Sequence, residues 1–265
     1  MYSTFQLARK FFHYYVTAAN GKGHGIHSPF VFSFIKNILN DKRPDPAHER
    51  FESIRKRLLK DNRMIEVEDF GAGSSVIKSN QRKISSMAAS SLKPAKFAKL
   101  LHRMVAAYQP AIMVELGTSF GITSAYMASG NPAGKLFTFE GAHSIAEIAR
   151  GHFQELGIEN IELTEGDFNH TLPVFLKSNR LIDFVFIDGN HRKLPTLSYF
   201  NSLLEKALPA CVFVFDDIHW SSEMEEAWKE IQQHERVTLS IDLFFIGIVF
   251  INPDFKEKQH FKIRF

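Results

Sequence analysis

From residue 111 to residue 251, the chain alternates short apolar runs with longer stretches whose apolar residues recur every three or four positions. The runs have the length of buried strands, and the longer stretches have the spacing of helices with one buried face. We expect strands at residues 111–116, 135–139, 160–164, 182–187, 210–215, 237–243 and 247–251, and helices at 121–129, 143–156, 195–207 and 221–234. This alternation predicts an α/β fold with a Rossmann-like doubly wound sheet of seven strands. Because few residues join the last two runs, the sheet is expected to include a late antiparallel strand.

Residues 1–90 have a different pattern, which predicts a helical, basic N-terminal extension before a domain at residues 91–265. Apolar positions at helical spacing predict helices at 5–19, 30–39 and 46–60, and another at 93–108. The aromatic-rich helix 5–19 is expected to dock on the rest of the chain, with a membrane surface or a homodimer interface as alternatives. The glycine-containing segments Gly21–Pro29 and Gly71–Ser75 are candidates for a lid over the active site.

Charge is distributed unevenly along the 265 residues. Residues 1–109 hold 19 lysines and arginines against 8 acids, whereas residues 110–265 hold 13 against 21. A basic N-terminal part suits nucleic acid, an acidic membrane surface or an anionic substrate. The basic residues are scattered, however, which favours docking on the acidic part or simple solvation and disfavours nucleic acid as a partner.

The cysteine content and the hydropathy of the chain indicate the cellular compartment of the protein. The single cysteine, Cys211, excludes an intrachain disulfide and lies within an apolar run, where it is expected to be a buried hydrophobe. No apolar stretch approaches the roughly 20 residues of a membrane span, and residues 1–6 do not start a secretory signal. We therefore expect a cytoplasmic protein without a membrane span.

The segment from Val114 to Thr123 predicts a ligand-binding turn between a strand and a helix. Gly117 and Gly121 bracket Thr118 and Ser119, and glycine permits the sharp turn and a close approach of backbone to ligand. A dinucleotide site uses three glycines in G-x-G-x-x-G, so two argue against NAD. Glu115 would repel phosphate and attract an ammonium group. The arrangement resembles the first motif of class I S-adenosylmethionine (SAM)-dependent methyltransferases, in which the acid faces the methionine moiety of the cofactor.

Acids also follow the next two predicted strands, at the edge of the sheet where ligands bind in doubly wound folds. Glu140, followed by Gly141, is a candidate acceptor for both hydroxyls of a ribose. Asp167 is a candidate acceptor for the adenine amino group, and Phe168 could stack on the ring. The alternative for Asp167 is a helix cap.

Asp188, His191, Asp216 and Asp217 follow the fourth and fifth strands and form the candidate chemical centre. Carboxylates that converge at neighbouring strand ends need a cation or a proton. Oxygen ligands at this density suit Mg²⁺, with Mn²⁺ or Ca²⁺ as alternatives. The alternative for His191, and for His219 nearby, is a helix cap or a hydrogen bond to a neighbouring acid.

Over roughly residues 90–252 the chain resembles small-molecule O-methyltransferases related to the catechol and caffeoyl-CoA enzymes. The resemblance implies a metal at Asp188 and Asp216, with Asp217 where the family has asparagine. It also implies a general base at His191, where the family has lysine. Ser91 and Leu92 are implied as cofactor contacts. An Asp-Gly-x-His stretch with a later Asp-Asp also occurs in a looser branch of methyltransferases, in which metal dependence is not assumed.

These observations predict an enzyme that methylates a hydroxyl of a small molecule, with SAM as cofactor and a divalent cation as a further candidate. Asp188 would hold the metal, the cofactor or the hydroxyl, and His191 would remove the proton. The alternatives are a SAM-binding protein that methylates nitrogen or has no turnover and, less favoured, an NAD-dependent oxidoreductase.

Overall fold

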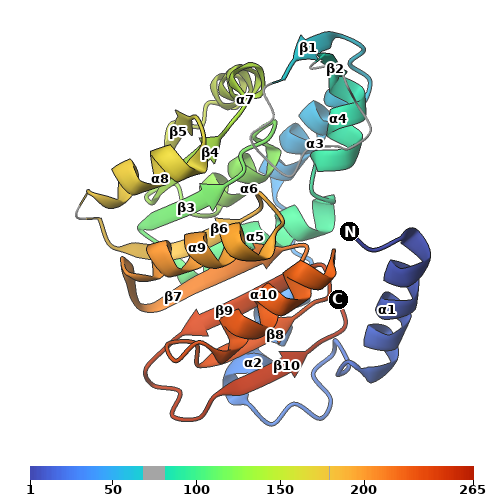
Figure 1. Ribbon diagram of the computed structural model, residues 1–265, viewed down its shortest axis with the longest axis vertical. Helices are drawn as coiled ribbons and strands as arrows, with labels where there is room; N and C mark the ends of the chain where they lie inside the picture. The colour runs from blue at the N-terminus through green and yellow to red at the C-terminus, as the bar shows by residue number, and fades with distance from the viewer. Residues whose placement is uncertain (68–80, 179) are drawn as a thin grey trace. The chain divides into compact units, whose positions relative to one another are not determined.

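The computed structural model of the protein describes residues 1–67, 81–178 and 180–265. The predicted lid segment Gly71–Ser75 lies outside these residues. The chain forms two compact units, which are described separately: unit 1 consists of Met1–Asp41 and Arg180–Phe265, and unit 2 of Lys42–Asn179 (Figure 1). The boundary expected at residue 90 does not coincide with these units, because the first 90 residues contribute helices to both. The division into an extension and a domain stays a prediction.

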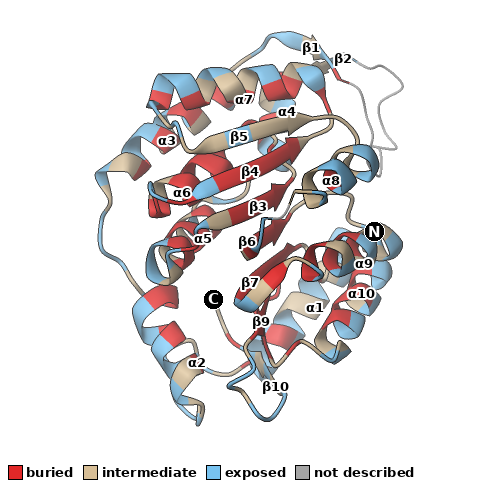
Figure 2. Ribbon diagram, turned by 90° about the vertical axis from the view of Figure 1, so that its left-hand side faces the viewer, coloured by how far each residue is buried: buried red, intermediate tan, exposed pale blue. Residues whose placement is uncertain are grey.

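Unit 2 contains three parallel strands in the order β3 (Ile112–Leu116), β4 (Lys135–Glu140) and β5 (Ile161–Glu165). Helices α6 (Ile122–Gly130) and α7 (His143–Leu156) connect them, as parallel pairing requires. The residues of β4 between its first and its last are buried, as the colouring of the ribbon in Figure 2 shows, which explains why this strand reads as a nearly continuous apolar run. Helix α5 (Ala95–Tyr108) precedes the strands, and α8 (Phe168–Leu176) follows them.

A second layer of unit 2 is built from helices N-terminal to these strands. Helices α3 (Pro46–Leu58) and α4 (Ile84–Ser91) pack with α6 and α7 around one buried cluster that includes Phe51, Ile54 and Tyr126. Strands β1 (Met64–Glu66) and β2 (Gln81–Lys83) pair antiparallel. The sequence did not predict α4, since its serines and alanines show no clear apolar stripe.

Unit 1 contains five strands in the order β10-β8-β9-β7-β6. Strand β6 (Ile182–Ile187) runs parallel to β7 (Ala207–Asp216), and β9 (Ile246–Ile251) runs antiparallel to both β7 and β8 (Leu239–Asp242). The predicted antiparallel strand is therefore confirmed. Strand β10 (Gln259–Lys262), parallel to β8, is additional to the seven expected strands. Its alternating partial exposure gives too weak an apolar signal to be predicted.

The helices of unit 1 are α1 (Thr4–Thr17), α2 (Pro29–Phe34), α9 (Lys193–Leu204) and α10 (Ser222–Gln233), with a π-helix, η1 (Ile35–Leu39), directly after α2. Ser3 and Gln6 form a capping box that starts α1. Phe11 of α1 lies 5.1 Å from Phe244, ring centre to ring centre, in an edge-to-face arrangement. The docked helix is confirmed.

Helix α1 also exposes four large apolar side chains, Phe5, Phe12, Tyr15 and Val16. Among the residues that the structure describes, no helix is both long enough and apolar enough to cross a membrane.

Candidate functional site

The predicted ligand-binding turn in unit 2 is held by the neighbouring strand. The backbone N–H groups of Gly117 and Thr118 both donate to the carbonyl of Phe139, each at 3.0 Å. Gly117, Ser119 and Gly121 have φ angles of 105°, 49° and 78°. Because two of these positions are glycine, the strained left-handed backbone costs little there, and Ser119 bears the remaining strain.

Packing against α7 is a separate structural reason for glycine at position 121. A Cβ placed there would lie 2.6 Å from Cε1 of Phe153 and 3.2 Å from Cβ of Ala149, both on α7. The close approach of backbone to ligand that the sequence predicts here stays a prediction. In the structure, Gly121 also lies close to the packed face of α7.

Glu115 is completely buried, with an exposed fraction of 0%. Its Oε2 accepts hydrogen bonds from the hydroxyls of Ser124 and of Thr138, the latter at 2.6 Å, and its Oε1 has no hydrogen-bond partner among the described residues. Burial raises the pKa of Glu115 to about 7 against the lowering effect of the two hydroxyls. Contact with a ligand requires neighbouring side chains to move, so recognition of an ammonium group by Glu115 stays a prediction.

Glu140, at the end of β4, is oriented by backbone donors. Its Oε2 accepts from the N–H of Ser119 at 2.8 Å, and its Oε1 accepts from the N–H of Ala142 at 3.0 Å. Burial raises the pKa of this carboxyl, while these N–H groups and that of Gly141 oppose the rise. The carboxylate is fixed at the edge of the turn, and each oxygen can accept one more hydrogen bond.

Asp167 is the N-cap of α8, which is one of the two roles that the sequence predicts for it. Its Oδ1 accepts from the backbone N–H of Asn169 at 2.9 Å and from the side-chain amide of the same residue at 3.0 Å. Phe168 is the first residue of the helix and is half-buried. The cap does not exclude a ligand, because Oδ2 keeps its lone pairs.

The end of α4 meets the turn. The hydroxyl oxygens of Ser91 and Ser119 lie 3.1 Å apart, and Ser91 also donates to the carbonyl of Met87 at 2.9 Å. Leu92 is the C-cap of α4 and is half-buried. Two segments 28 residues apart, both predicted to contact the cofactor, are therefore adjacent in unit 2.

In unit 1, Asp188, His191 and Asp216 come together after strands β6 and β7. One ligand atom from each lies within 4.8 Å of the others. Nε2 of His191 is 3.8 Å from Oδ1 of Asp188, which is too far for a hydrogen bond. Asp216 is buried, with an exposed fraction of 1%.

Asp217 is not a member of this three-residue group in the part of the chain that the structure describes. It adopts a left-handed φ of 52°, and its N–H donates to the carbonyl of Phe245 at 2.7 Å. Asp216 thus belongs to the group with Asp188 and His191, whereas its neighbour Asp217 does not belong to it among the described residues.

His219 lies between two acids. Nδ1 is 2.9 Å from Glu225 and Nε2 is 2.9 Å from Asp242. Burial alone would lower the pKa of His219, but the two carboxylates outweigh it and raise the pKa above its ordinary value. The sequence predicts a hydrogen bond to an acid as one alternative for His219. It does not identify the two acids, which lie 6 and 23 residues further along the chain.

Comparisons with known proteins concern the domain and the fold of the chain. Residues 114–218 match a family described as a methyltransferase domain. No curated protein matches the chain. Residues 114–218 are thus similar to a methyltransferase domain, and the α/β sheet has the Rossmann-like fold class that the sequence predicted. The proposed oxidoreductase alternative finds no support in this match.

Solved structures show the same fold at low sequence identity. The O-methyltransferase TomG from Streptomyces achromogenes, involved in tomaymycin synthesis and solved with SAM, has 20% identity and a TM-score of 0.57, covering 79% of this chain and 91% of TomG. An O-methyltransferase from Bacillus cereus, solved with SAH, has 18% identity and a TM-score of 0.57, with coverages of 83% and 97%. The SAH-bound methyltransferase PaMTH1 from Podospora anserina has 12% identity and a TM-score of 0.58, with coverages of 94% and 96%.

Proposed function

We propose that the protein transfers a methyl group from SAM to a hydroxyl oxygen of a small molecule. The observation that carries this proposal is the turn Gly117–Gly121, which lies inside the matched methyltransferase domain and is hydrogen-bonded to the carboxylate of Glu140 through Ser119. The presence of SAM or SAH in the similar O-methyltransferases from S. achromogenes and B. cereus supports the choice of cofactor and of oxygen as acceptor.

Within unit 2, Glu140 would accept the two ribose hydroxyls, because its oxygens face the turn and are held by backbone N–H groups. The turn itself, with Ser91 and Leu92 beside it, would surround the methionine part. Asp167 and Phe168 would receive the adenine, the acid by accepting from its amino group and the ring by stacking. Glu115 would favour the cationic end of the cofactor by adding negative charge behind the turn.

Methyl transfer requires few catalytic groups from the protein, because the sulfonium of SAM already activates the methyl group. The enzyme must align the acceptor oxygen with the carbon–sulfur bond and remove the proton of the hydroxyl. His191 would take this proton on its imidazole, and Asp188, 3.8 Å away, would stabilise the imidazolium that forms. Asp216 would orient the hydroxyl.

A divalent cation is an alternative use of the same three side chains. Two carboxylates and one imidazole with ligand atoms within 4.8 Å of one another fit such an ion, so Asp188, His191 and Asp216 would hold it. When bound, the metal would polarise the acceptor hydroxyl and make its proton easier to lose. An imidazole nitrogen that binds a metal cannot accept the proton with the same lone pair, so the base and the ligand are competing roles for that nitrogen of His191.

Calorimetry with SAM, with and without Mg²⁺, tests the cofactor and the metal in one series. We expect SAM to bind wild type, and Glu140→Gln to weaken binding by about tenfold through the loss of a charged hydrogen-bond acceptor. Glu159→Gln, an exposed acid in the same unit, is the matched control and should bind normally. Absence of SAM binding to the folded wild type would refute the proposal.

Methyl transfer from labelled SAM to a panel of mono- and dihydroxylated phenols then separates the two roles of His191. As a base, His191→Ala should lower turnover by about 100-fold or more, and chelation should have no effect. As a metal ligand, Asp216→Asn and chelation should both abolish turnover, and Mg²⁺ or Mn²⁺ should restore it to the chelated wild type.

A further inference from the structure

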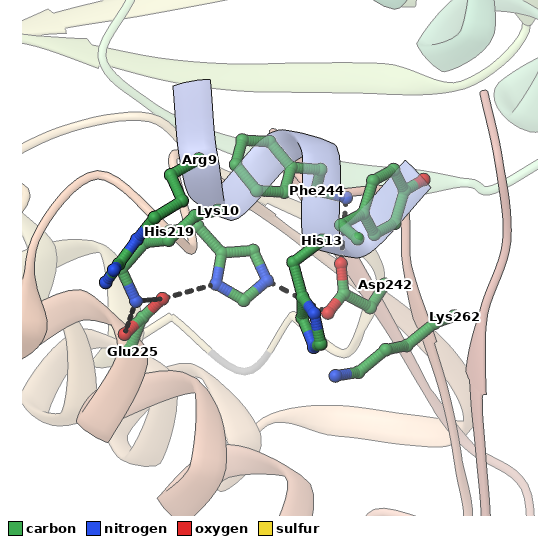
Figure 3. Close-up of a pocket in the computed structure, with 9 residues that line it drawn as sticks. Arg9, Lys10, His13, His219, Glu225, Asp242, Phe244 and Lys262 are labelled. Carbon is green, nitrogen blue, oxygen red and sulfur yellow. Dashed lines mark hydrogen bonds and ion pairs between the residues drawn. The ribbon is translucent and has the colours of Figure 1, made fainter. Parts of the chain in front are cut away.

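Unit 1 contains a pocket of about 470 Å³ that the proposed methyl transfer does not use (Figure 3). It lies between α1 and the segments around strands β8 and β10. Its size falls within the range of roughly 300–1,000 Å³ that small-molecule sites occupy. The lining residues come from four separate segments of the chain: Arg9, Lys10, His13 and Tyr14; His219 and Glu225; Asp242 and Phe244; and Lys262.

The two acids of the pocket are each paired with a base. Glu225 accepts from Nζ of Lys10, at 3.0 Å from each carboxylate oxygen, and from the hydroxyl of Tyr2 at 2.8 Å. His219 bridges Glu225 and Asp242, at 2.9 Å from each. Asp242 also accepts from the N–H of Phe244 at 2.8 Å. These acids are therefore matched by Lys10 and by a His219 that favours its charged form.

Three basic side chains of the pocket remain outside these pairs: Arg9, His13 and Lys262. All three are exposed, and their side chains make no hydrogen bond or ion pair within residues 1–67, 81–178 and 180–265. Arg9 and His13 are four residues apart on α1 and so project from the same side of the helix. Figure 3 shows them on the helix and Lys262 on a separate segment of the same pocket wall.

The N-terminal segment does not supply an acid that could neutralise these basic side chains. Residues 1–40 contain four lysines and arginines and no aspartate or glutamate. With Glu225 and Asp242 already paired, Arg9 and Lys262 leave the pocket with an excess of positive charge. A concave site with an excess of positive charge attracts small anions from solution.

We propose that this pocket binds a small organic anion through Arg9, His13 and Lys262, with a carboxylate or phosphate group as the recognised chemistry. The guanidinium of Arg9 can donate two parallel hydrogen bonds to either group, and the ammonium of Lys262 adds a point charge. His13 adds a ring N–H donor. The apolar part of the ligand would lie toward Phe244 and Tyr14.

Calorimetric titration of the full chain at low ionic strength, with inorganic phosphate and with benzoate, tests the proposal. Benzyl alcohol serves as the neutral control ligand. We expect saturable binding of at least one anion at one site per chain, weakened by added salt because the charges are exposed. Binding of phosphate alone identifies a phosphate site, binding of benzoate alone a carboxylate site, and binding of both a general anion site.

The double variant Arg9→Gln/Lys262→Gln assigns the binding to the pocket. Each removed charge should weaken anion binding by about tenfold, because hydrogen bonds to charged groups are the stronger kind. Lys36→Gln removes an exposed lysine of the same unit outside the pocket and should leave binding unchanged. An unchanged thermal unfolding midpoint would confirm that the variants fold.

Two results would overturn the inference: no saturable binding of either anion to wild type, or equal binding by wild type and the double variant. Solvated surface charges would give the first result, and an anion site elsewhere would give the second. Neither result bears on SAM binding by unit 2, which is measured separately.

Discussion

Glu115→Gln is expected to stabilise the protein at alkaline pH. Burial raises the pKa of Glu115 to about 7 from an ordinary value of 4.5, so the folded chain keeps this proton over a pH range in which the unfolded chain has lost it. Each pH unit between the two pKa values corresponds to about 1.4 kcal/mol. Deprotonation of Glu115 therefore costs the folded chain up to about 3 kcal/mol of stability.

The sign of this effect follows from the raised pKa. The contribution of Glu115 is most favourable below the unfolded value of 4.5, declines as the pH rises toward 7 and is fully unfavourable above it. Glutamine has nearly the shape of a protonated glutamate and does not titrate. We expect Glu115→Gln to match wild type within about 1 kcal/mol near pH 5 and to exceed it by about 2–3 kcal/mol near pH 8.

Urea unfolding followed by circular dichroism, at several pH values between these limits, gives the free energy of unfolding directly. Glu159→Gln is the control, because this acid is exposed in the same unit. Parallel pH profiles for wild type and Glu115→Gln would refute the reasoning. A gain in stability accompanied by weaker SAM binding would show that the buried charge is kept for function rather than for folding.

Two further predictions concern backbone packing and the half-buried His219. Gly121→Ala should lower the free energy of unfolding in urea by about 2–3 kcal/mol, because the φ of Gly121 is 78° and the new Cβ would meet Phe153 at 2.6 Å. Gly151 lies within helix α7 with open space around it, so Gly151→Ala should raise the free energy of unfolding by up to about 1 kcal/mol. Equal effects of the two alanines would contradict this. His219→Gln should destabilise by about 2 kcal/mol near pH 6, and the difference should shrink as the pH rises through the raised pKa of His219, because the charged imidazole is the stabilising form. A thermal melting series against pH measures this, and a constant difference would argue against a charged His219.

The sequence predicted the central strands because buried parallel strands read as apolar runs, and Phe137 to Phe139 is an example. It also placed Glu140 correctly at a strand end. It missed α4, whose small residues give no periodic signal, and β10, whose residues are only partly covered. In both cases, contacts with distant segments determine the element, and local pattern carries little of that information.

Electrostatic environment was the least predictable property of the site. Glu115 was expected to offer a charge to a ligand, but it is buried and accepts hydrogen bonds from Ser124 and Thr138, which the fold brings to it from a helix and from the next strand. The raised pKa of His219 likewise depends on its contacts with Glu225 and Asp242. A motif predicts which residue types are present, whereas the pKa depends on neighbours that only the tertiary structure supplies.

The charge asymmetry of the chain is explained in part by specific pairs. Lys10 binds Glu225 at 3.0 Å in unit 1, and Arg57 binds Glu155 at 2.5 Å in unit 2, so some basic residues of the N-terminal part dock on acids of the later part, as one interpretation of the sequence required. The exposed pair Arg57–Glu155 contributes at most about 1 kcal/mol, so it orients segments more than it stabilises them. Arg9 is one residue from Lys10 but has no such acid among the described residues. The attraction of the pocket for an anion therefore depends on which basic side chains remain without an acidic partner, and the net charge of the chain does not predict it.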